Sequence, residues 1–396
     1  MKVLKIIFKI FVYIFAVIGF ILVAGYFAVK YNFTNTIAVV DKNSDKYQEA
    51  SVNFNKSAIY NSQADALLNS QADMNIKDLE AKINELKDAS QALADLKLER
   101  QRDLCKIDAI GAVSPVNAAN IAKAYSAGAG RWTFSQMVLA VSIRLEDNAD
   151  FQKNLADCDA LTASSLDEQQ ILGKYQNATG TNLFDWANSD SWDIITKAIS
   201  KDESVIKRAS TILDIKPRLL VSILIVEQLR LYDTQREYFE KFFQPLQILA
   251  NANKMAWGVM SIKEKTAIDV ENNLKNPNSI FYPGEGYEHL LDFKTADPAK
   301  ERYDRIANEH DHYFSYLYGG LIIKELITQW DDQGYNIENR PEVLATLFNI
   351  GFTSSKPKAD PQVGGSIINL NGTSYTFGSL AHEFYYSGLI PEFPLE

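Results

Sequence analysis

A long apolar run near the N-terminus constrains this chain more than any other feature. Residues 10–29, IFVYIFAVIGFILVAGYFAV, contain no charged side chain. A helix of this length, at ~1.5 Å rise per residue, spans ~30 Å, which matches the hydrocarbon core of a bilayer. The lysines that precede the run (Lys2, Lys5 and Lys9) predict a cytoplasmic N-terminus by the positive-inside rule. We therefore expect residues 1–33 to form the cytoplasmic N-terminus and a single-pass transmembrane anchor, with the remaining chain outside the cytoplasmic membrane.

A cleaved signal peptide is the alternative to an uncleaved anchor. Signal peptides normally have an apolar core of about 7–15 residues and a small-residue cleavage site. Val23-Ala24-Gly25 is a weak match to such a site. Both alternatives export the rest of the chain, so Cys105 and Cys158 lie in a compartment where a disulfide persists. The sequence leaves open whether these two cysteines pair or are buried free thiols.

The charge balance argues against a nucleic-acid partner. The 396 residues include 40 basic and 50 acidic side chains, a net charge of −10 at pH 7. Proteins that bind nucleic acids normally have a basic face. The 2 cysteines, 19 glycines and 11 prolines also exclude a disulfide framework, a collagen-like chain and a wholly disordered chain.

The segment after the anchor has the pattern of polar, amphipathic helices. In residues 34–110, apolar side chains recur three and four positions apart (Ile76, Leu79, Ile83 and Leu86), as on one face of a helix. This pattern predicts a helical stalk, either a hairpin or a short coiled coil. Protein partners in the cell envelope are candidates for binding it. Residues 111–200 continue the helical pattern and predict an accessory region with three core tryptophans (Trp132, Trp186 and Trp192).

Longer apolar helices begin after residue 200. Asp202 and Glu203 are typical of a helix start, and Pro217 is typical of the first position of the next helix. The run Leu219–Val226 is almost entirely apolar, which predicts a buried helix. Near the C-terminus, Asn371-Gly372 separates two short strand-like runs and predicts a β-hairpin. The fold class expected from these patterns is mainly α with one small β-hairpin.

One carboxylate stands out because it directly follows the buried helical run. Glu227 comes after Val226, where a carboxyl group is expected to lose hydration. Burial favours the protonated form of a carboxyl group, and a general acid at neutral pH needs that form. The alternative is an ion pair with Arg230, which is three residues further on and on the same helical face.

Three motifs in a fixed order carry a resemblance to a known enzyme family. Glu227-Gln228 ends an apolar helix that a proline starts. Gly258-Val259-Met260-Ser261 comes next, with Thr266-Ala267 after four intervening residues, and Leu347–Gly351, LFNIG, follows another apolar helix. These segments resemble the Glu-Ser, Gly-Leu-Met-Gln…Thr-Ala and Ala-Tyr-Asn-Ala-Gly motifs of the lytic transglycosylases. That family consists of lysozyme-like enzymes that cut the glycan strands of bacterial peptidoglycan, and the resemblance covers roughly residues 201–355.

The resemblance implies a lysozyme-like catalytic domain over residues 201–396, in the periplasm or cell wall space. It implies that Glu227 is the catalytic residue, first as general acid and then as base. The bond cleaved would be the β-1,4 bond between N-acetylmuramic acid and N-acetylglucosamine, and the product a 1,6-anhydromuramoyl end. Motif positions implied to bind the glycan strand are Gly258, Met260, Ser261, Phe348 and Asn349. The reaction of this family needs no cofactor and no metal.

The chain departs from the family motifs at three polar positions. Ser261 stands in place of Gln and shortens a polar arm expected to contact the sugar. Phe348 stands in place of Tyr and lacks a hydroxyl expected near the catalytic carboxyl, and Gln228 stands in place of Ser. These departures favour an alternative function, a catalytically silent envelope scaffold that binds peptidoglycan with the same fold. For Met260 the alternative is a core residue, and for Asn349 a turn cap.

A metal site is not expected. His310 and His312 flank Asp311, but residues two apart on a helix point to different faces. His382-Glu383 lacks the second histidine of a zinc-protease motif.

Overall fold

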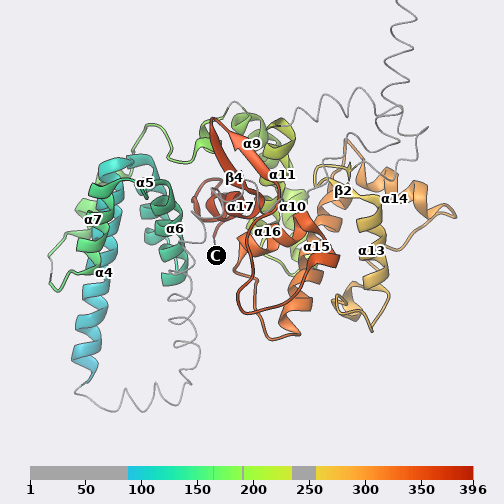
Figure 1. Ribbon diagram of the computed structural model, residues 1–396, viewed down its shortest axis with the longest axis horizontal. Coiled ribbons are helices and arrows are strands. Elements are labelled where there is room, and N and C mark those ends of the chain that lie inside the picture. The colour runs from blue at the N-terminus through green and yellow to red at the C-terminus, as the bar shows by residue number, and fades with distance from the viewer. Residues whose placement is uncertain (1–87, 164, 190, 234–255, 396) are drawn as a thin grey trace, which may run out of the picture. The chain divides into compact units, whose positions relative to one another are not determined.

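The computed structural model describes residues 88–163, 165–189, 191–233 and 256–395 (Figure 1). The predicted membrane anchor at residues 10–29 and most of the predicted stalk at 34–110 lie outside this part of the chain. Within the described residues, no helix combines the length and the apolar character needed to cross a bilayer.

The described chain is mainly α, as predicted, and forms two compact units. Unit 1 contains residues 201–339 and 347–361, and unit 2 contains the described residues up to 200 together with 340–346 and 362–396. The division differs from the predicted 201–396 domain, because the C-terminal 35-residue stretch from 362 belongs to unit 2.

Unit 1 consists of five helices, a two-stranded hairpin and short 3-10 turns in the described residues. The helices are α10 (Glu203–Leu213), α11 (Pro217–Asp233), α13 (Glu264–Leu274), α14 (Pro298–Ile306) and α15 (Tyr313–Asp331). The hairpin is formed by β1 (Ala256–Trp257) and β2 (Ile262–Lys263), and the 3-10 turns are Glu285–Tyr287 and Phe352–Ser354. Helix α16 (Pro341–Ile350) begins in unit 2 and ends in unit 1.

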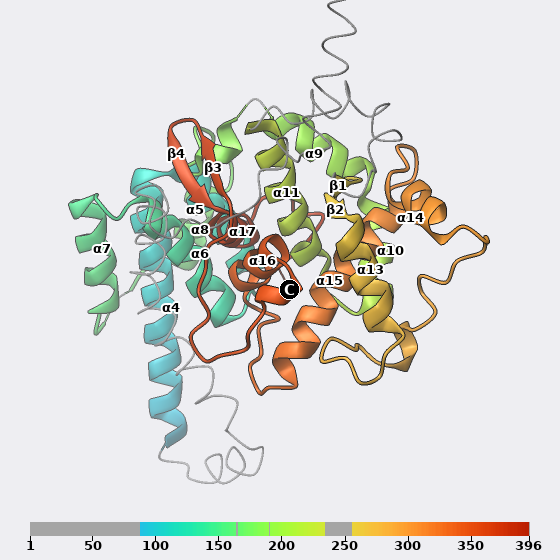
Figure 2. The same cartoon turned by 45° about the vertical axis from the view of Figure 1, so that its right-hand side comes forward.

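Helix α15 runs through the middle of unit 1, in contact with α10, α11, α13, α14 and β2 (Figures 1 and 2). Two adjacent glycines on α15 allow close packing. A Cβ atom on Gly319 would lie 2.8 Å from the Met260 side chain, and one on Gly320 would lie 2.4 Å from Leu213. The small residues therefore let α10 and the turn after β1 approach the central helix closely.

The predicted starts of α10 and α11 are confirmed. Asp202 is the N-cap residue of α10, yet its side chain does not cap the helix. Instead it accepts hydrogen bonds from the Tyr316 hydroxyl, at 2.7 Å, and contacts His312 Nδ1 at 2.5 Å. Helix α11 begins at Pro217, and all residues of Leu219–Val226 are buried, as the apolar run predicts.

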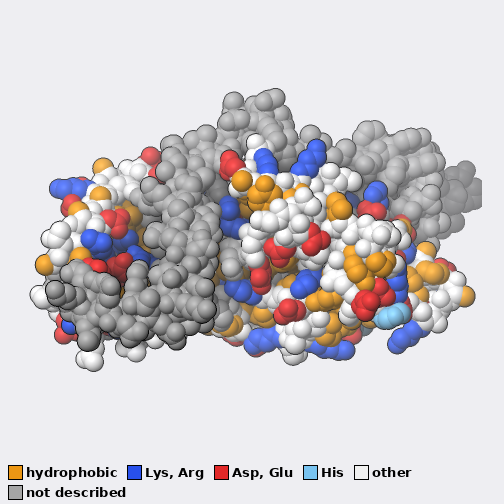
Figure 3. Space-filling view, turned by 90° about the horizontal axis from the view of Figure 1, so that it is seen from below, with side chains coloured by type: hydrophobic (Ala, Val, Ile, Leu, Met, Phe, Trp, Pro, Cys, Tyr) orange, Lys and Arg blue, Asp and Glu red, His pale blue; other side chains and the backbone are white. Residues whose placement is uncertain are grey.

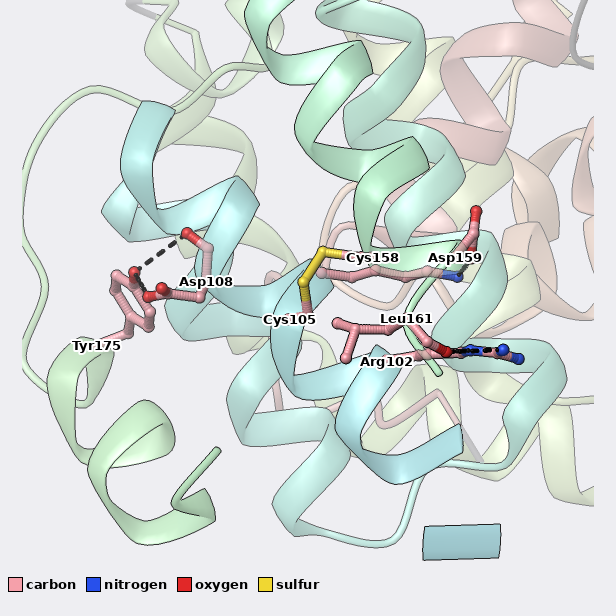
Figure 4. The surroundings of a disulfide bond; sticks show 8 residues. Arg102, Cys105, Asp108, Cys158, Asp159, Leu161 and Tyr175 are labelled. Carbon is pink, nitrogen blue, oxygen red and sulfur yellow. Dashed lines mark hydrogen bonds and ion pairs between the residues drawn. A yellow bond between two sulfur atoms is a disulfide. The ribbon is translucent and has the colours of Figure 1, made fainter. Parts of the chain in front are cut away.

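The first described helix of unit 2 is α4 (Asp88–Val113), which continues through the predicted boundary between stalk and accessory region at residue 110. The next helices are α5 (Pro115–Ser126), α6 (Arg131–Arg144), α7 (Ala149–Asp159), α8 (Glu168–Tyr175) and α9 (Trp192–Lys201), with a 3-10 turn at Asp185–Asn188. Cys105 on α4 and Cys158 on α7 form a disulfide with Cα atoms 5.6 Å apart (Figure 4). The structure thus answers the question of pairing that the sequence leaves open.

The disulfide lies among polar contacts that join α4 to the segments after it (Figure 4). The Arg102 guanidinium donates to the Leu161 carbonyl oxygen at 2.9 and 3.1 Å. The Tyr175 hydroxyl on α8 donates to the Asp108 carboxylate at 2.5 Å. These bonds fix α7 and α8 along α4 on both sides of the disulfide.

The C-terminal segment joins unit 2 through buried charges. Helix α17 (Phe377–Tyr386) carries Glu383, which is 2% exposed. Its carboxylate accepts from Arg144 Nε at 2.6 Å and from Trp186 Nε1 at 3.0 Å. A buried carboxylate is stable only with such partners. These bonds hold α17 against α6 within unit 2.

The predicted β-hairpin is confirmed. Strands β3 (Ile367–Leu370) and β4 (Thr373–Thr376) pair antiparallel, with Leu370 opposite Thr373 and the Asn371-Gly372 turn between them. Both turn residues have positive φ, 50° and 89°, which a two-residue hairpin of this type requires. Of the three predicted core tryptophans, Trp186 is fully buried, whereas Trp132 and Trp192 are half-buried.

Candidate functional site

The Glu227 carboxylate lies in the C-terminal half of α11 and is buried, as predicted, with 4% of the residue exposed. It accepts a hydrogen bond from Arg230 Nη2 in an ion pair within one turn of the helix. Among the described residues, Arg230 is the bonding partner of this carboxylate. The structure therefore contains both features that the sequence presents as alternatives, a buried carboxyl group and an ion pair with Arg230.

The second motif forms a tight turn between β1 and β2, which the sequence analysis does not predict. Ser261 N–H donates to the Gly258 carbonyl oxygen at 3.1 Å and closes the turn. Gly258 has φ 67° and Ser261 has φ 51°, both in the left-handed region. A serine in this region is uncommon, because its Cβ crowds the backbone there. The two strands are two residues each, too short for an alternating pattern to reveal them.

Gly258 is needed for contact with the protein itself. A Cβ atom at this position would lie 2.3 Å from the Ile306 carbonyl oxygen and 2.6 Å from Ser315 Oγ. The close backbone approach at Gly258 is therefore made to the end of α14 and the start of α15.

Met260 is a core residue. Its side chain has no exposed surface, and it packs against Gly319 on α15. Its backbone N–H donates to Ser315 Oγ at 3.1 Å. The sequence allows Met260 to bind the glycan or to pack in the core, and the structure shows it packed beneath the turn. Ser261, the next residue, is half-buried.

One hydrogen bond brings the first two motifs together. Gln228 Nε2 on α11 donates to the Val259 carbonyl oxygen in the turn at 2.7 Å. The turn of α11 that carries Glu227 is thereby held against the turn 258–261. Sequence reasoning did not identify this contact, because the two residues are 31 positions apart and nothing local links them.

The third motif lies at the end of α16. Phe348 and Asn349 are in the last turn of this helix and are half-buried. Gly351 follows with φ 84° and ends the helix, and its N–H donates to the Leu347 carbonyl oxygen at 2.8 Å. Phe352, the next residue, packs on Phe281 with ring centroids 4.9 Å apart. All three motifs thus belong to unit 1.

A second buried acid lies in unit 1, and the sequence analysis does not single it out. Glu325 on α15 is fully buried, and burial raises its pKa well above the usual range of a glutamate. Asn273 Nδ2 donates to its carboxyl group at 2.8 Å. The sequence does contain a sign of this buried acid, because Glu325 lies within the largely apolar run GGLIIKELI, much as Glu227 follows one. Its complete burial makes it a packing residue of the α13–α15 interface.

A charged network fixes α14 to the same interface. Arg302 forms a bidentate pair with Glu271 on α13, at 2.7 Å from Nε and 2.5 Å from Nη2. The Tyr318 hydroxyl on α15 donates to the same carboxylate at 2.6 Å, and burial raises the pKa of Tyr318 far above its ordinary value. The hairpin turn therefore rests on a rigid frame of three helices.

The surface of the described residues carries mixed charge. On the face shown in Figure 3, acidic and basic side chains are interspersed among apolar ones. Of the histidines considered for a metal, His310 is exposed and His312 bonds Asp202. The described part of the chain contains no group of three or more His, Cys, Asp or Glu side chains placed to hold a metal ion.

No protein-family model matches this chain, and searches of curated proteins and of solved structures likewise found no match.

Proposed function

We propose that this protein is a membrane-anchored murein lytic transglycosylase with Glu227 as its catalytic residue. The observation that carries the proposal is the hydrogen bond from Gln228 to Val259, which joins α11 at the position next to Glu227 to the turn 258–261. These are the first two motifs of the resemblance. The buried Glu227 and the mainly α architecture of unit 1 agree with it.

The proposed reaction uses one carboxyl group twice. Glu227 donates its proton to the oxygen between N-acetylmuramic acid and N-acetylglucosamine, and the bond from that oxygen to the muramoyl C1 breaks. The muramoyl N-acetyl group stabilises the positive charge that develops at C1. The 6-hydroxyl oxygen of the same sugar then bonds C1, and the Glu227 carboxylate takes the hydroxyl proton. The product is a 1,6-anhydromuramoyl end, no water is consumed, and Glu227 ends protonated as it began.

The ion pair with Arg230 sets a condition on this reaction. The Arg230 guanidinium occupies the Glu227 carboxyl group, whereas the first step needs that group at the glycosidic oxygen. In the proposed cycle, the Arg230 guanidinium therefore leaves the carboxyl group before the glycosidic oxygen is protonated.

The proposed location follows from the predicted anchor and is supported by the disulfide. Disulfides persist in oxidising compartments and are rare in the cytosol, and Cys105 is bonded to Cys158. We propose that residues 10–29 anchor the chain in the cytoplasmic membrane and that both units lie in the periplasm or cell wall space, where peptidoglycan is found. No cofactor enters the proposed reaction.

The test is the chemistry of the released products. The full-length chain is incubated with purified peptidoglycan, and the soluble products are analysed by mass spectrometry. Anhydromuramoyl ends are expected from the wild type, and none from Glu227→Gln, in which the side chain still accepts from Arg230. Glu227→Asp, which keeps the charge but withdraws the carboxyl by one methylene, is expected to be at least 100-fold slower, on the order of the effect of misplacing a catalytic group by about 1 Å.

A matched control is Glu203→Gln, which removes the carboxylate of another ion pair on a helix of unit 1, the pair with Lys207. This variant should keep wild-type activity. Reducing ends in place of anhydro ends would show a hydrolase. Absence of any release from the wild type would overturn the proposed enzyme.

The second candidate is a catalytically silent scaffold that binds glycan strands. The specific observation that favours it is the ion pair itself, because Arg230 occupies the carboxyl group that the lyase reaction needs. Phe348 and Ser261 add to it, since both lack the longer polar group of the family motif. The scaffold predicts co-sedimentation with insoluble peptidoglycan without product release, and equal binding by the wild type and Glu227→Gln.

A further inference from the structure

We infer that Gln228 is a positioning residue, which holds Glu227 at a fixed distance from the turn 258–261. The inference rests on the proposed function, because it assigns a second residue to the same site. It begins from the bond between Gln228 Nε2 and the Val259 carbonyl oxygen, at 2.7 Å, from a half-buried side chain.

The turn is fixed on its opposite side by α15. Met260 N–H donates to Ser315 Oγ, and the Met260 side chain fills the space above Gly319. Gly258 is in close contact with Ile306 and Ser315, so the turn has no room to shift toward the helices beneath it. These contacts hold the turn from beneath, and the freedom that then matters to the site is the position of the Glu227 turn of α11 relative to it.

Gln228 removes that freedom. It is the residue next to Glu227, so any shift of the α11 end that moves Glu227 also stretches the bond to Val259. The bond needs a long side chain with a donor at its tip. The amide nitrogen of Gln is four bonds from Cα, whereas the hydroxyl oxygen of a Ser, the family residue at this position, is two bonds away. The longer residue thus makes a contact between segments that a serine does not reach in this geometry.

The consequence for catalysis concerns the rate of the chemical step. A displacement of a catalytic group by about 1 Å lowers a rate by as much as ~100-fold. In the proposed function, glycan binding depends on other residues of the motifs, among them Ser261, Phe348 and Asn349. Loss of the Gln228 bond is therefore expected to lower kcat and to leave KM nearly unchanged.

The experiment compares Gln228→Met with the wild type in the full-length chain. Methionine has a similar length and volume but no donor. Two readouts are taken: kcat and KM for product release from peptidoglycan, and amide hydrogen exchange of residues 258–263. We expect kcat to fall ~10-fold or more, KM to change by less than about 2-fold, and exchange in the hairpin to rise.

The matched control is Gln152→Met in unit 2. Gln152 also donates its side-chain amide to a backbone carbonyl, that of Leu145 at 3.0 Å, from a half-buried position. This variant should leave both readouts at wild-type values. The control distinguishes the effect of losing the bond between Gln228 and Val259 from the general effect of replacing a half-buried glutamine by methionine.

The outcomes test the positioning role of Gln228 separately from the proposed lyase activity. If Gln228→Met releases products at the wild-type kcat, or if hairpin exchange is unchanged, the positioning role is wrong. If exchange rises in Gln228→Met while the wild type releases no product, the bond is confirmed as a mechanical tether and the proposed lyase is wrong. A fall in kcat with an equal rise in KM would also overturn the inference, because it would show loss of glycan binding.

Discussion

The guanidinium of Arg230 donates to the carboxylate of Glu227 within one turn of α11, and both side chains are almost completely shielded from solvent, at 11% and 5% exposure. A pair of this kind has two consequences. It compensates two charges that are costly to bury, and it occupies the carboxyl group on which the proposed reaction depends.

Replacing one partner of this pair should destabilise unit 1. Arg230→Met leaves the Glu227 charge buried without compensation, and we expect the free energy of unfolding to fall by about 3 kcal/mol. The double variant Glu227→Gln/Arg230→Met removes both charges and should recover more than half of that loss. Urea unfolding of the two variants and the wild type provides the measurement. Equal destabilisation by the single and double variants would show that the pair contributes nothing.

Gly258 should not tolerate a side chain. In Gly258→Ala, the new Cβ would meet the Ile306 carbonyl oxygen at 2.3 Å, with φ at 67°. A left-handed non-glycine residue costs about 1–3 kcal/mol even without a contact, so we expect a loss of about 3 kcal/mol in urea unfolding.

Gly286→Ala is the control for this substitution. Gly286 is in unit 1, has an ordinary backbone conformation, and has nothing within 4 Å of the added Cβ. The control should lie within about 0.5 kcal/mol of the wild type. A tolerated Gly258→Ala would mean that the turn rests less tightly on α14 and α15 than the structure shows.

The disulfide should stabilise unit 2 substantially. Cys105 and Cys158 are separated by 53 positions, and closing a loop of that size stabilises a fold by about 4 kcal/mol on the chain-entropy model. The variant Cys105→Ser/Cys158→Ser should unfold at lower urea and show faster hydrogen exchange in α4 and α7. Exchange in α15 of unit 1 should stay the same in this variant, and a change there instead of in α4 would contradict the assignment.

Unit 2 should lose stability in mild acid because of His382. This side chain is 1% exposed on α17, its Nε2 faces Gln136 Oε1 at 2.9 Å, and burial lowers its pKa to about 4. The unfolded chain binds a proton near pH 6.5, while the folded chain does not. Above pH 6.5 this group therefore does not lower the free energy of unfolding. As the pH falls from 6.5 to about 4, the free energy of unfolding declines by up to ~1.4 kcal/mol per pH unit and ~3 kcal/mol in total.

The pH dependence is measured by urea unfolding at several pH values. His382→Gln, which has a donor that can still reach Gln136, should show a weaker decline between pH 6.5 and 4. His310→Gln, at an exposed position, should decline as the wild type does. A wild-type decline that persists fully in His382→Gln would place the titrating group elsewhere.

Local signals allowed several elements to be predicted from the sequence. Glu203 and Pro217 lie in the first turns of α10 and α11, whose starts they mark in the sequence. Asn371-Gly372 marks the β3–β4 hairpin in the same way. The possible pairing of Glu227 with Arg230 is also local, since the two are three residues apart.

Contacts between distant segments explain what the sequence did not reveal. The bond between Gln228 and Val259 needs the folded arrangement of α11 and the hairpin before the residues meet. The assignment of α17 to unit 2 depends on Arg144 and Glu383, which are 239 positions apart. Neither pair has a local pattern, because a hydrogen bond between separate elements leaves no periodic signal in either segment.

Each of the two units is built from segments that are separated in the sequence, and this has a practical consequence. Between residues 200 and 362 the backbone passes from one unit to the other four times, after 200, 339, 346 and 361. Trimming the gene at either end therefore cannot yield one unit whole and free of the other. A stop codon after residue 361 would strip α17 from unit 2, whose helices α4 to α9 precede those of unit 1 in the chain, so a frameshift near the end of the gene would damage a unit that is already largely translated.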